Sequence, residues 1–512
     1  HHRTGHRRQR GLVHRMKPHC DCLILGSGIS GMTLTMLFAS AGFQVTTLEK
    51  SVSPGGAMQR FRRQGIPLDT GFHFTGGMTD CFGDMLDLLG IRDSIEAVPT
   101  SLTVQFTESG NRYELPAGIS ALEQMLCERF PDNAASLHRY FQAERDVFDN
   151  TPLFHLRSGG AFAEGLPDLK WDHVTLGAFL DELQIHGELR GLLCGMCSCH
   201  GTPPGEIPFS SHARIDYGLS NDLVRLRNGG EALVSAFLHK TEELDIDFRT
   251  NTTVRKFGEA GSDRKIHSAE LSDGTEIEFE HLIFTQHPRE ILHLLPSAGN
   301  AFRSRVEEFS DTCGFFTAYA LIDDDAEDFQ EGLFSCLTTS DLDAVLLGTD
   351  PKARTTGYLF STERRNDGTP CRTVTAFQSV FPAETAAWND TVTGKRPLEY
   401  REYKARKAAE IEEQLLRFKP GLRGKMHSLA SASMLTFRDW LSGFGAAYGI
   451  RQKMDQHNLF GRLPVRNFYT ASQSSILPGA AGSMLTALVL FRQLAGEEIY
   501  RKFITARLES GK

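Results

Sequence analysis

The first strongly patterned stretch of the chain alternates short apolar runs with glycines. Residues 22–25 (Cys-Leu-Ile-Leu) form an apolar run long enough for one buried strand of a parallel sheet. Three glycines in the spacing G-x-G-x-x-G follow, and residues 32–41 then form an apolar, helix-like segment that Gly42 ends. A second strand-like run, residues 44–48, leads to the acidic Glu49. The pattern predicts a strand, a tight turn, a helix and a second strand in succession.

Each glycine of this turn has a physical role in holding a dinucleotide. Gly26 permits the tight turn out of the strand, Gly28 lets a pyrophosphate approach the backbone, and Gly31 lets the helix pack closely on the sheet. The helix N-terminus offers free N–H groups and the positive end of its dipole to the phosphates. Glu49 stands where a carboxylate can accept hydrogen bonds from an adenosine ribose. Because these parts fall in register, the stretch predicts a dinucleotide-binding site.

Helix-like and strand-like segments alternate along the rest of the chain. The hydrophobic periodicity predicts helices at residues 119–130, 134–148, 176–183, 189–199, 232–244, 400–418 and 484–495. Strand-like segments stand at residues 247–249, 253–257, 281–285, 315–322 and 373–381. Asp273-Gly274 predicts a hairpin turn, and a strand that starts at residue 465 leads through a loop of small residues into the last helix.

The strand-and-helix pattern of the first segment returns near residue 226 and again near residue 441. We therefore predict an α/β fold in which a dinucleotide-binding domain is discontinuous in sequence and an α+β substrate domain is inserted into it. The predicted segments are residues 1–15 (a tag or disordered tail), 16–79 (cofactor domain, first part), 80–225 (helical insertion of the substrate domain), 226–299 (cofactor domain, second part), 300–440 (substrate domain) and 441–512 (cofactor domain, third part).

The composition is that of an ordinary globular protein. Of the 512 residues 40% are hydrophobic and 23% charged, and the formal net charge is −9, so nothing indicates nucleic acid as a partner. No apolar run reaches the length of a membrane span. The ten cysteines are scattered without a secretory signal, which predicts reduced thiols and a cytoplasmic location. The 35 phenylalanines could line an apolar tunnel, although core packing is the commoner explanation.

Two side chains are candidates for the chemistry of the site. His73, in Gly-Phe-His-Phe, could lie beside a bound ligand and transfer a proton, or it could be a structural histidine bonded to backbone or cofactor. Tyr448, in a run of glycine and alanine, could donate a proton, line a tunnel or simply pack in the core. No triad of nucleophile, base and acid is evident in the sequence.

Four neighbouring side chains invite a metal interpretation. Cys194, Cys197, Cys199 and His200 have the pattern C-x-x-C-x-C-H, but no second pair at a matching distance completes a tetrahedral site. Cys194 and Cys197 also fit one face of a helix, where buried thiols act as small apolar residues. We therefore predict no metal site.

The chain resembles the FAD-dependent oxidoreductases of the phytoene desaturase group, and within it the branch of carotenoid isomerases and retinol saturases. The motifs that carry the resemblance are residues 26–31 with Glu49-Lys50, the glycine doublet 55–56, residues 68–73 (Leu-Asp-Thr-Gly-Phe-His), residues 227–230 (Arg-Asn-Gly-Gly) and the closing segment 467–482. The similarity runs from about residue 20 to residue 496. These motifs are specific for the FAD superfamily and much less so for one substrate.

The resemblance implies a Rossmann-like FAD-binding domain of the glutathione-reductase type that holds FAD noncovalently. Glu49 would bind the adenosine ribose and the backbone of Val254 the adenine, while residues 473–484 would close over the ribityl chain and the pyrimidine edge of the flavin. The cofactor-binding residues that it implies are Gly26, Gly28, Ile29, Ser30, Gly31, Glu49, Lys50, Gly55, Gly56, Ala57, Met58, Val254, Gln473, Ala481, Gly482 and Met484.

Two positions depart from the pattern of the family. Ala57 follows the second glycine doublet, where the family often has arginine. Gln473 stands where many relatives carry an aspartate on the ribityl side of the flavin. An amide still forms hydrogen bonds but brings no charge, so the departure bears on the affinity for FAD rather than on the identity of the cofactor.

The resemblance further implies that the protein desaturates, saturates or isomerises C=C bonds of a long apolar substrate such as a carotenoid or retinoid. A flavin amine oxidase or porphyrinogen oxidase is the enzymatic alternative, because it shares the cofactor frame. A prenyl-binding protein of the GDP-dissociation-inhibitor type, without flavin, is the non-enzymatic one. The family also allows a peripheral membrane contact that would fetch a lipid-like substrate. Only one nucleotide fingerprint is visible, so a bound NAD(P) is not supported and the redox partner stays unidentified.

Overall fold

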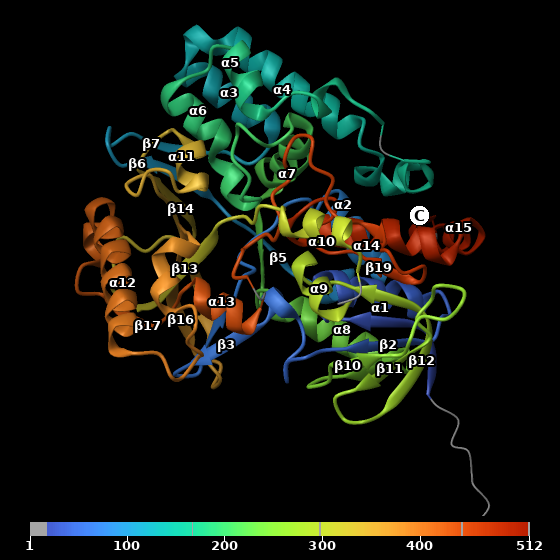
Figure 1. Cartoon of the computed structure of the whole chain (residues 1–512). Helices are drawn as coiled ribbons and strands as arrows, with labels where there is room; N and C mark the ends of the chain where they lie inside the picture. The colour runs from blue at the N-terminus through green and yellow to red at the C-terminus, as the bar shows by residue number, and fades with distance from the viewer. Residues whose placement is uncertain (1–17, 166, 296–297, 442–443, 510–512) are drawn as a thin grey trace, which may run out of the picture.

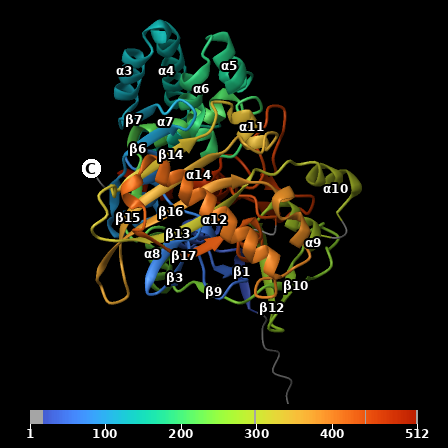
Figure 2. The ribbon, with the colours of Figure 1, turned by 90° about the vertical axis from the view of Figure 1, so that its left-hand side faces the viewer.

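Two large β-sheets and a cap of helices dominate the described part of the chain, which also has two small two-stranded sheets. The structure is a computed structural model that describes residues 18–165, 167–295, 298–441 and 444–509. In Figures 1 and 2 the cap lies at one end of the molecule and both sheets lie below it. The predicted tail at residues 1–15 lies outside the described residues.

The larger sheet has eight strands and collects segments that are far apart in sequence. Its strand order is β10-β11-β12-β1-β2-β9, with β19 paired to β12 and β18 paired to β19. The central strands are parallel, as the pairings of β1 with β2 and β12 and of β12 with β19 show. The bounds are β1 (His19–Leu25), β2 (Val45–Leu48), β9 (Asp247–Arg249), β10 (Val254–Phe257), β11 (Ser268–Leu271), β12 (Glu276–Phe284), β18 (Gly461–Arg462) and β19 (Phe468–Thr470). This is the parallel core of a Rossmann-like α/β fold, as the sequence predicts.

Two helices pack against each other beside this sheet. Helix α1 (Ile29–Ser40) follows β1 directly, and its residues 30–38 are all buried. Helix α14 (Gly479–Ala495) comes from the far end of the chain. The rings of Phe38 and Phe491 meet edge to face with their centroids 5.1 Å apart. The glycine turn and the C-terminal segment are thus fixed to each other.

The start of α14 corrects a prediction. The sequence predicts a loop of small residues up to residue 483 and a helix from Met484, but the helix begins at Gly479, just after Pro478. Gly-Ala-Ala-Gly-Ser is compatible with either state, and the packing of this segment on α1 stabilises the helix. In the segment expected to close over the flavin as a loop, residues 473–478 are therefore outside the helix and residues 479–484 are the start of α14.

The second sheet has seven strands in the order β17-β13-β16-β15-β14-β6-β7, and most of its neighbours are antiparallel. Its long strands include the predicted segments near residues 315–322 and 373–381. The bounds are β6 (Leu102–Phe106), β7 (Arg112–Leu115), β13 (Gly314–Ile322), β14 (Gly332–Leu337), β15 (Thr355–Arg364), β16 (Pro370–Val380) and β17 (Met426–Ala432). The amphipathic helix α12 (Leu398–Phe418) covers one face of this sheet (Figure 2).

The cap consists of helices that precede and follow the Pro-Pro-Gly break near residue 204. They are α3 (Ile119–Arg129), α4 (Ala134–Asp149), α5 (Leu176–Glu182), α6 (Gly187–Cys194) and α7 (Phe209–Asp222). Helix α6 is shorter than the predicted helix at 189–199, because residues Gly195–Cys199 continue it as a 3-10 helix. Helix α7 was not among the predicted helices, because its polar residues obscure its apolar face.

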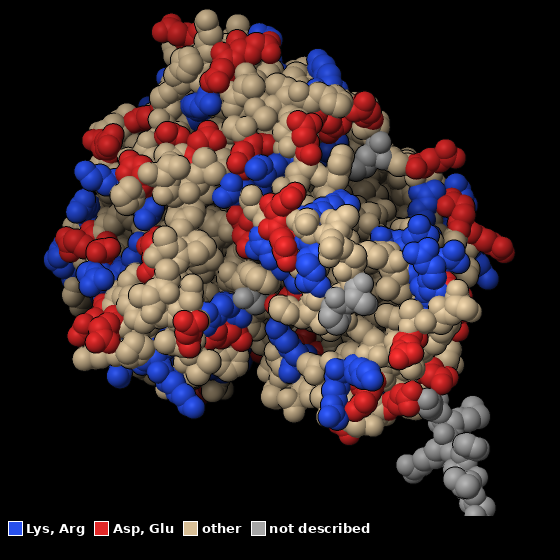
Figure 3. Space-filling model, viewed as in Figure 1, with Lys and Arg blue, Asp and Glu red and all other residues tan. Residues whose placement is uncertain are grey.

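Side chains of both charges are found on the surface. On the face drawn in Figure 3, acidic and basic side chains lie interspersed. Every helix in the described part of the chain is too short or too polar to cross a bilayer.

Candidate functional site

One large cavity connects the glycine turn to the interior of the cap. It encloses about 3040 Å³ of empty space, open solvent at its mouth included. The segments that line it include residues 26–30, 49–51, 56–59, 71–77, 446–449, 472–474 and 477–483, together with side chains of the second sheet and of the cap. Ser30 and Ala481, from opposite ends of the chain, are both on its wall.

At one end of the cavity Glu49 is held by the turn that it faces. Its Oε2 accepts hydrogen bonds from the backbone N–H of Ser27 (3.0 Å) and from the Ser27 hydroxyl (2.6 Å). Its Oε1 accepts one from the backbone N–H of Ser51 (2.8 Å). The side chain is buried at the end of β2 and lines the cavity, which fixes an acidic group beside the turn.

The turn has the space that a dinucleotide needs. A Cβ placed on Gly31 would lie 1.9 Å from the carbonyl oxygen of Gly26, so only glycine lets α1 approach the strand this closely. A Cβ placed on Gly28 would meet nothing within 4 Å, and Gly28 lines the cavity. The open side of the turn therefore accepts a ligand whose phosphates approach backbone N–H groups at the start of α1.

A second helix start borders the same cavity. Gly479, Ala481 and Gly482 in the first turn of α14 line it. Gln473 lies just before this helix and also lines the cavity, and its amide donates a hydrogen bond of 3.4 Å to the carbonyl oxygen of Ala447. The positive end of the α14 dipole thus faces the same space as the start of α1.

Most of the predicted cofactor residues come together on this wall. Those that line the cavity are Gly26, Gly28, Ile29, Ser30, Glu49, Lys50, Gly56, Ala57, Met58, Gln473, Ala481 and Gly482. Gly31, Gly55, Val254 and Met484 are outside its lining. Gly31 and Met484 lie inside α1 and α14, where they pack the helices, and Val254 begins β10 at the edge of the sheet.

His73 lines the middle of the cavity and lies parallel to an aromatic ring. Its ring stacks on Phe377 at 4.8 Å with an angle of 5°. Its Nδ1 is 4.0 Å from a carboxylate oxygen of Asp69 and has no hydrogen-bond partner among the described residues. Burial lowers the pKa of His73 below its ordinary value, and the Asp69 carboxylate only partly opposes this. The ring is therefore neutral near pH 7.

A buried ion-pair network lies behind His73. Arg60 contacts Asp69 at 2.7 Å and Glu363 at 2.9 Å, and Arg225 pairs with Glu363 as well. All of these side chains are nearly inaccessible to solvent. Because the charges compensate one another, Asp69 is held in place and His73 faces a fixed environment.

Tyr448 also lines the cavity. Its ring meets Phe315 edge to face, with centroids 6.2 Å apart. Burial raises the pKa of Tyr448 well above its ordinary value, so the phenol keeps its proton. It can donate a hydrogen bond into the cavity, and it contributes an aromatic wall.

The part of the cavity that extends into the cap is apolar. We call this part the apolar chamber. The apolar side chains that line it come from α3, α4, α6, α7 and the neighbouring strands, and they are Val104, Leu115, Leu122, Leu126, Phe141, Leu192, Leu193, Leu219 and Leu337. Such a wall binds hydrocarbon by the hydrophobic effect and excludes water.

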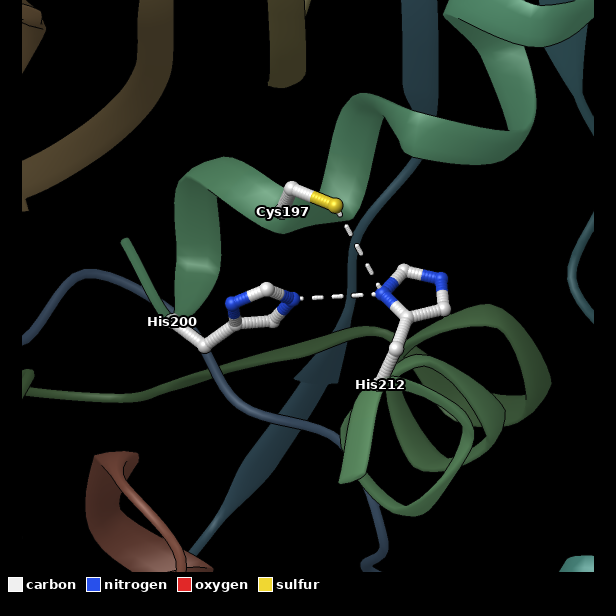
Figure 4. A group of neighbouring side chains, drawn as sticks. All are labelled: Cys197, His200 and His212. Carbon is white, nitrogen blue, oxygen red and sulfur yellow. Dashed lines mark hydrogen bonds between the residues drawn. The ribbon is translucent and has the colours of Figure 1, made fainter. Parts of the chain in front are cut away.

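Three side chains below the cap lie close enough to hold a metal ion. The Sγ of Cys197, the Nε2 of His200 and the Nδ1 of His212 lie within 4.8 Å of one another, and Figure 4 shows them pointing toward a common centre. The two histidine nitrogens are 3.2 Å apart and the sulfur is 3.7 Å from His212. His212 lies on α7, twelve residues after His200, so the pattern C-x-x-C-x-C-H at residues 194–200 did not include it.

A hydrogen bond at His200 argues against a metal. The backbone N–H of Thr202 donates to the Nδ1 of His200 at 3.2 Å, so the proton of the neutral ring is on Nε2. A metal would need the lone pair of that same nitrogen. With its proton there, Nε2 donates to the Nδ1 of His212 instead. Burial lowers the pKa of both rings, which keeps them neutral. The absence of a metal stays a prediction, and this hydrogen bond supports it.

Two carboxyl groups at the apolar wall were not among the predicted site residues. Glu144 on α4 and Asp216 on α7 lie beside His212, with the three ligating atoms within 4.8 Å of one another. Asp216 lines the cavity, whereas Glu144 does not. In the sequence, a glutamate on the inner face of the predicted amphipathic helix could have indicated Glu144 as a buried polar group. Its partner Asp216 could not be found in this way, because α7 was not predicted.

A comparison with protein families identifies the fold. The model of the flavin containing amine oxidoreductases matches residues 29–321, more than half of the chain. The chain belongs to this family. Its cofactor is FAD, and it is an FAD-dependent oxidoreductase. The predicted cofactor and the predicted Rossmann-like fold are thereby confirmed.

Individual relatives agree with the predicted branch. The chain is 21% identical to all-trans-retinol 13,14-reductase of Macaca fascicularis, over 97% of this chain and 89% of the relative. Over 27% of this chain it is 27% identical to prolycopene isomerase 2 of an Oncidium hybrid cultivar, of which 24% is covered. A crystal structure of an oxidoreductase from Methanosarcina mazei has the same fold, with a TM-score of 0.62 and 13% identity over 92% of this chain and 99% of the other. The expected resemblance to the carotenoid isomerase and retinol saturase branch is confirmed.

Proposed function

We propose that this FAD-dependent oxidoreductase desaturates, saturates or isomerises C=C bonds of a long apolar polyene of the retinoid or carotenoid class. The observation that carries the proposal is the continuity of one cavity from the glycine turn into an apolar chamber in the cap. The similarity to a retinol reductase over nearly the whole chain supports the polyene as the substrate class. The chamber suits a hydrocarbon chain, since its wall offers bulky apolar side chains.

In this proposal the two helix starts hold the cofactor between them. Glu49 would accept hydrogen bonds from the ribose, while backbone N–H groups at the start of α1 would bind the pyrophosphate. Gln473 and the first turn of α14, which line the same cavity, would hold the flavin end, where the helix dipole favours negative charge. FAD supplies the transfer of two electrons as hydride. The residues of the chain position the substrate and exclude water from this transfer.

His73 and Tyr448 are the candidates for proton transfer. Saturation of a C=C bond adds two electrons and two protons, so one proton must come from the protein or from water when the other arrives as hydride. His73 is neutral and lines the cavity, so it can take up and pass on a proton at Nδ1. Tyr448 keeps its proton and orients the substrate by its aromatic edge.

The apolar chamber weighs against the alternative functions. An amine substrate would favour a pair of aromatic side chains bracketing the flavin, whereas a polyene would favour a long apolar passage such as the one that reaches into the cap. A prenyl-binding protein without flavin has no use for the hydrogen-bonded Glu49 and the open Gly28. Both alternatives give a different result in the experiment below.

We further propose a peripheral membrane contact at the cavity mouth. Trp440, at the end of α13 (Met434–Trp440), is 60% exposed and lines the cavity. Val392 is 57% exposed, and its neighbour Thr393 is hydrogen-bonded to Asp439 beside Trp440. An exposed tryptophan and valine at a cavity mouth can enter a lipid surface and admit an apolar substrate. The location of the protein in the cell stays an expectation.

The test is a spectroscopic one on the purified protein. The yellow absorbance of bound FAD is expected, followed by bleaching on anaerobic reduction and reoxidation or product formation on adding a polyene. Retinoids, carotenoids, amines and porphyrinogens are screened in parallel with product analysis. Turnover of an amine and not of any polyene would contradict the proposed substrate class. A colourless protein that FAD cannot reconstitute would contradict the enzyme itself.

A further inference from the structure

Two carboxyl groups lie together where the apolar chamber meets helix α7. Glu144 comes from α4 and is completely buried, and Asp216 from α7 is 7% exposed. One oxygen of each, with a ring nitrogen of His212, lies within 4.8 Å of the others. Only Asp216 reaches the cavity wall. The pair therefore presents a single carboxyl group to the chamber, with the second directly behind it.

The described surroundings provide no matching hydrogen bonds for the inner carboxyl group. Neither oxygen of Glu144 has a hydrogen-bond partner among the described residues. The nearby rings of His200 and His212 are neutral, because burial lowers their pKa. Burial, and then the neighbouring Asp216 carboxylate, raises the pKa of Glu144 well above its ordinary value. Glu144 therefore keeps its proton near pH 7, since two adjacent buried carboxylates repel each other.

His212 is held rigidly between this pair and the 3-10 helix beneath the chamber. Its Nδ1 faces the Nε2 of His200 at 3.2 Å, and its Nε2 faces the hydroxyl of Tyr140 at 3.4 Å. The Thr202 N–H donates to the Nδ1 of His200, so the proton of that ring is on Nε2 and points to His212. This chain fixes α7, and with it Asp216, relative to the wall of the chamber.

The carboxyl group of Asp216 lies in a wall that is otherwise mainly apolar. Phe141, Leu192 and Leu219 line the same chamber. Arg214 and Ser220 of α7 line the cavity too, but Arg214 is paired with Asp172 and Ser220 donates to Asp216. Ser198 also lines the cavity, and its hydroxyl has no hydrogen-bond partner in the described residues. The 3-10 helix that carries Ser198 contacts α7. A ligand that is apolar along its length and ends in one polar group would match this wall.

We propose that Asp216, backed by Glu144, binds the terminal hydroxyl group of an otherwise apolar polyene. This inference rests on the proposed function, because it assigns the polar end of the substrate to the cap while its C=C bonds lie nearer the flavin. A carboxyl group can accept the hydroxyl proton, and the Ser198 hydroxyl can donate to the same oxygen. The Ser220 hydroxyl already donates to Oδ2 of Asp216, at a long 3.4 Å. A hydrocarbon or an ether in this place would add no second donor to the buried carboxyl, so the pocket selects an alcohol.

The experiment compares two ligands that differ only in the hydroxyl. The FAD-loaded protein is titrated with an all-trans polyene alcohol and with its methyl ether, and binding is followed by the absorbance of the polyene. The wild-type protein is expected to bind the alcohol about 10-fold more tightly or better, because the ether cannot donate a hydrogen bond to the buried Asp216 carboxyl. Asp216→Leu is expected to remove this preference, and Asp216→Asn to retain part of it, since an amide still accepts the hydroxyl proton.

The control is Asp132→Leu, an exposed aspartate before α4, which is expected to leave the preference unchanged. Equal binding of alcohol and ether by the wild-type protein overturns this inference alone, even where Asp216→Leu fails to fold. Preference for a primary amine over the alcohol overturns it too, since the pair would then be an ammonium site. One equivalent of zinc in the purified protein would make the cluster a metal site and has the same consequence. A protein that binds neither polyene overturns the proposed function together with the inference.

Discussion

Glu49 accepts two hydrogen bonds from Ser27, one from its backbone N–H at 3.0 Å and one from its hydroxyl at 2.6 Å. The acid that ends β2 is thus bonded to the first turn of the FAD site before any ribose is considered. We expect Glu49→Ala to lower the affinity for FAD about 10- to 100-fold, because hydrogen bonds to a charged group contribute about 1.5–3 kcal/mol. The measurement is the dissociation constant of FAD by flavin fluorescence.

Glu49→Gln keeps the size of the side chain and removes its charge, so it shows how much of the FAD affinity depends on the charge. The amide oxygen can still accept from the Ser27 N–H, but the second oxygen is replaced by a donor that faces the Ser51 N–H. Its affinity for FAD is expected to lie between those of the wild type and Glu49→Ala. The exposed Glu259→Gln is the matched control and should bind FAD normally. Full FAD affinity in Glu49→Ala would show that the ribose is held by other groups.

Substitution by alanine is expected to affect stability at Gly31 and FAD affinity at Gly28. Gly31→Ala would place a Cβ 1.9 Å from the carbonyl oxygen of Gly26, so the helix must move away from the strand. We expect it to destabilise the protein by about 1–3 kcal/mol or more, as overpacking does. Gly28→Ala has room for its Cβ, so the apo-protein should keep its melting temperature while its affinity for FAD falls.

Thermal melting of both apo-proteins and titration with FAD distinguish the two cases. Gly42→Ala lies outside the cavity in a left-handed conformation and controls for the loss of glycine at a turn. A Gly28→Ala protein that binds FAD like the wild type would mean that the pyrophosphate does not approach this backbone. A Gly31→Ala protein of unchanged stability would contradict the close packing of α1.

The sequence predicts the parts of this site whose pattern is local. The strand, turn and helix at residues 19–40 follow from an apolar run and three glycines, and the structure agrees within a few residues. The start of α14 was missed because small residues are compatible with loop and helix, and only packing on α1 decides between them. Glu144 and Asp216 could not be paired in advance, because their proximity depends on how α4 packs against α7.

His73 is expected to matter for turnover and not for FAD content. His73→Phe keeps a ring that can stack on Phe377 but removes the nitrogen that can carry a proton. If His73 passes on a proton, kcat should fall by about 100-fold or more, while the flavin spectrum stays the same. The exposed His138→Phe is the control. A kcat within a few fold of the wild type would make His73 a wall residue only.

The lowered pKa of His73 also predicts how stability depends on pH. A histidine whose pKa in the folded state lies below the unfolded value of about 6.5 stabilises the fold above that pH, and this stability is lost as the pH falls. The melting temperature of the wild type should therefore fall in acid more steeply than that of His73→Phe. Parallel curves for the two proteins would show that the ring is more accessible to solvent than the structure indicates.

Glu144 predicts the opposite dependence on pH. Its raised pKa means that the folded protein holds a proton that the unfolded chain releases above about pH 4.3. This group contributes stability below its unfolded pKa and loses it as the pH rises through the folded value. The neighbours that face it include Asp216, which opposes ionisation, and Arg145, which favours it to a smaller extent.

Glu144→Gln removes the titrating group with little change in shape, so the variant should become more stable relative to the wild type as the pH rises. Melting temperatures measured from about pH 5 to about pH 9 test this, because the difference between the two proteins is expected to widen steadily in favour of the variant. The exposed Glu164→Gln should follow the wild type throughout. A constant difference would mean that Glu144 is ionised in the folded protein, and the proton that the pair is inferred to hold would then be elsewhere.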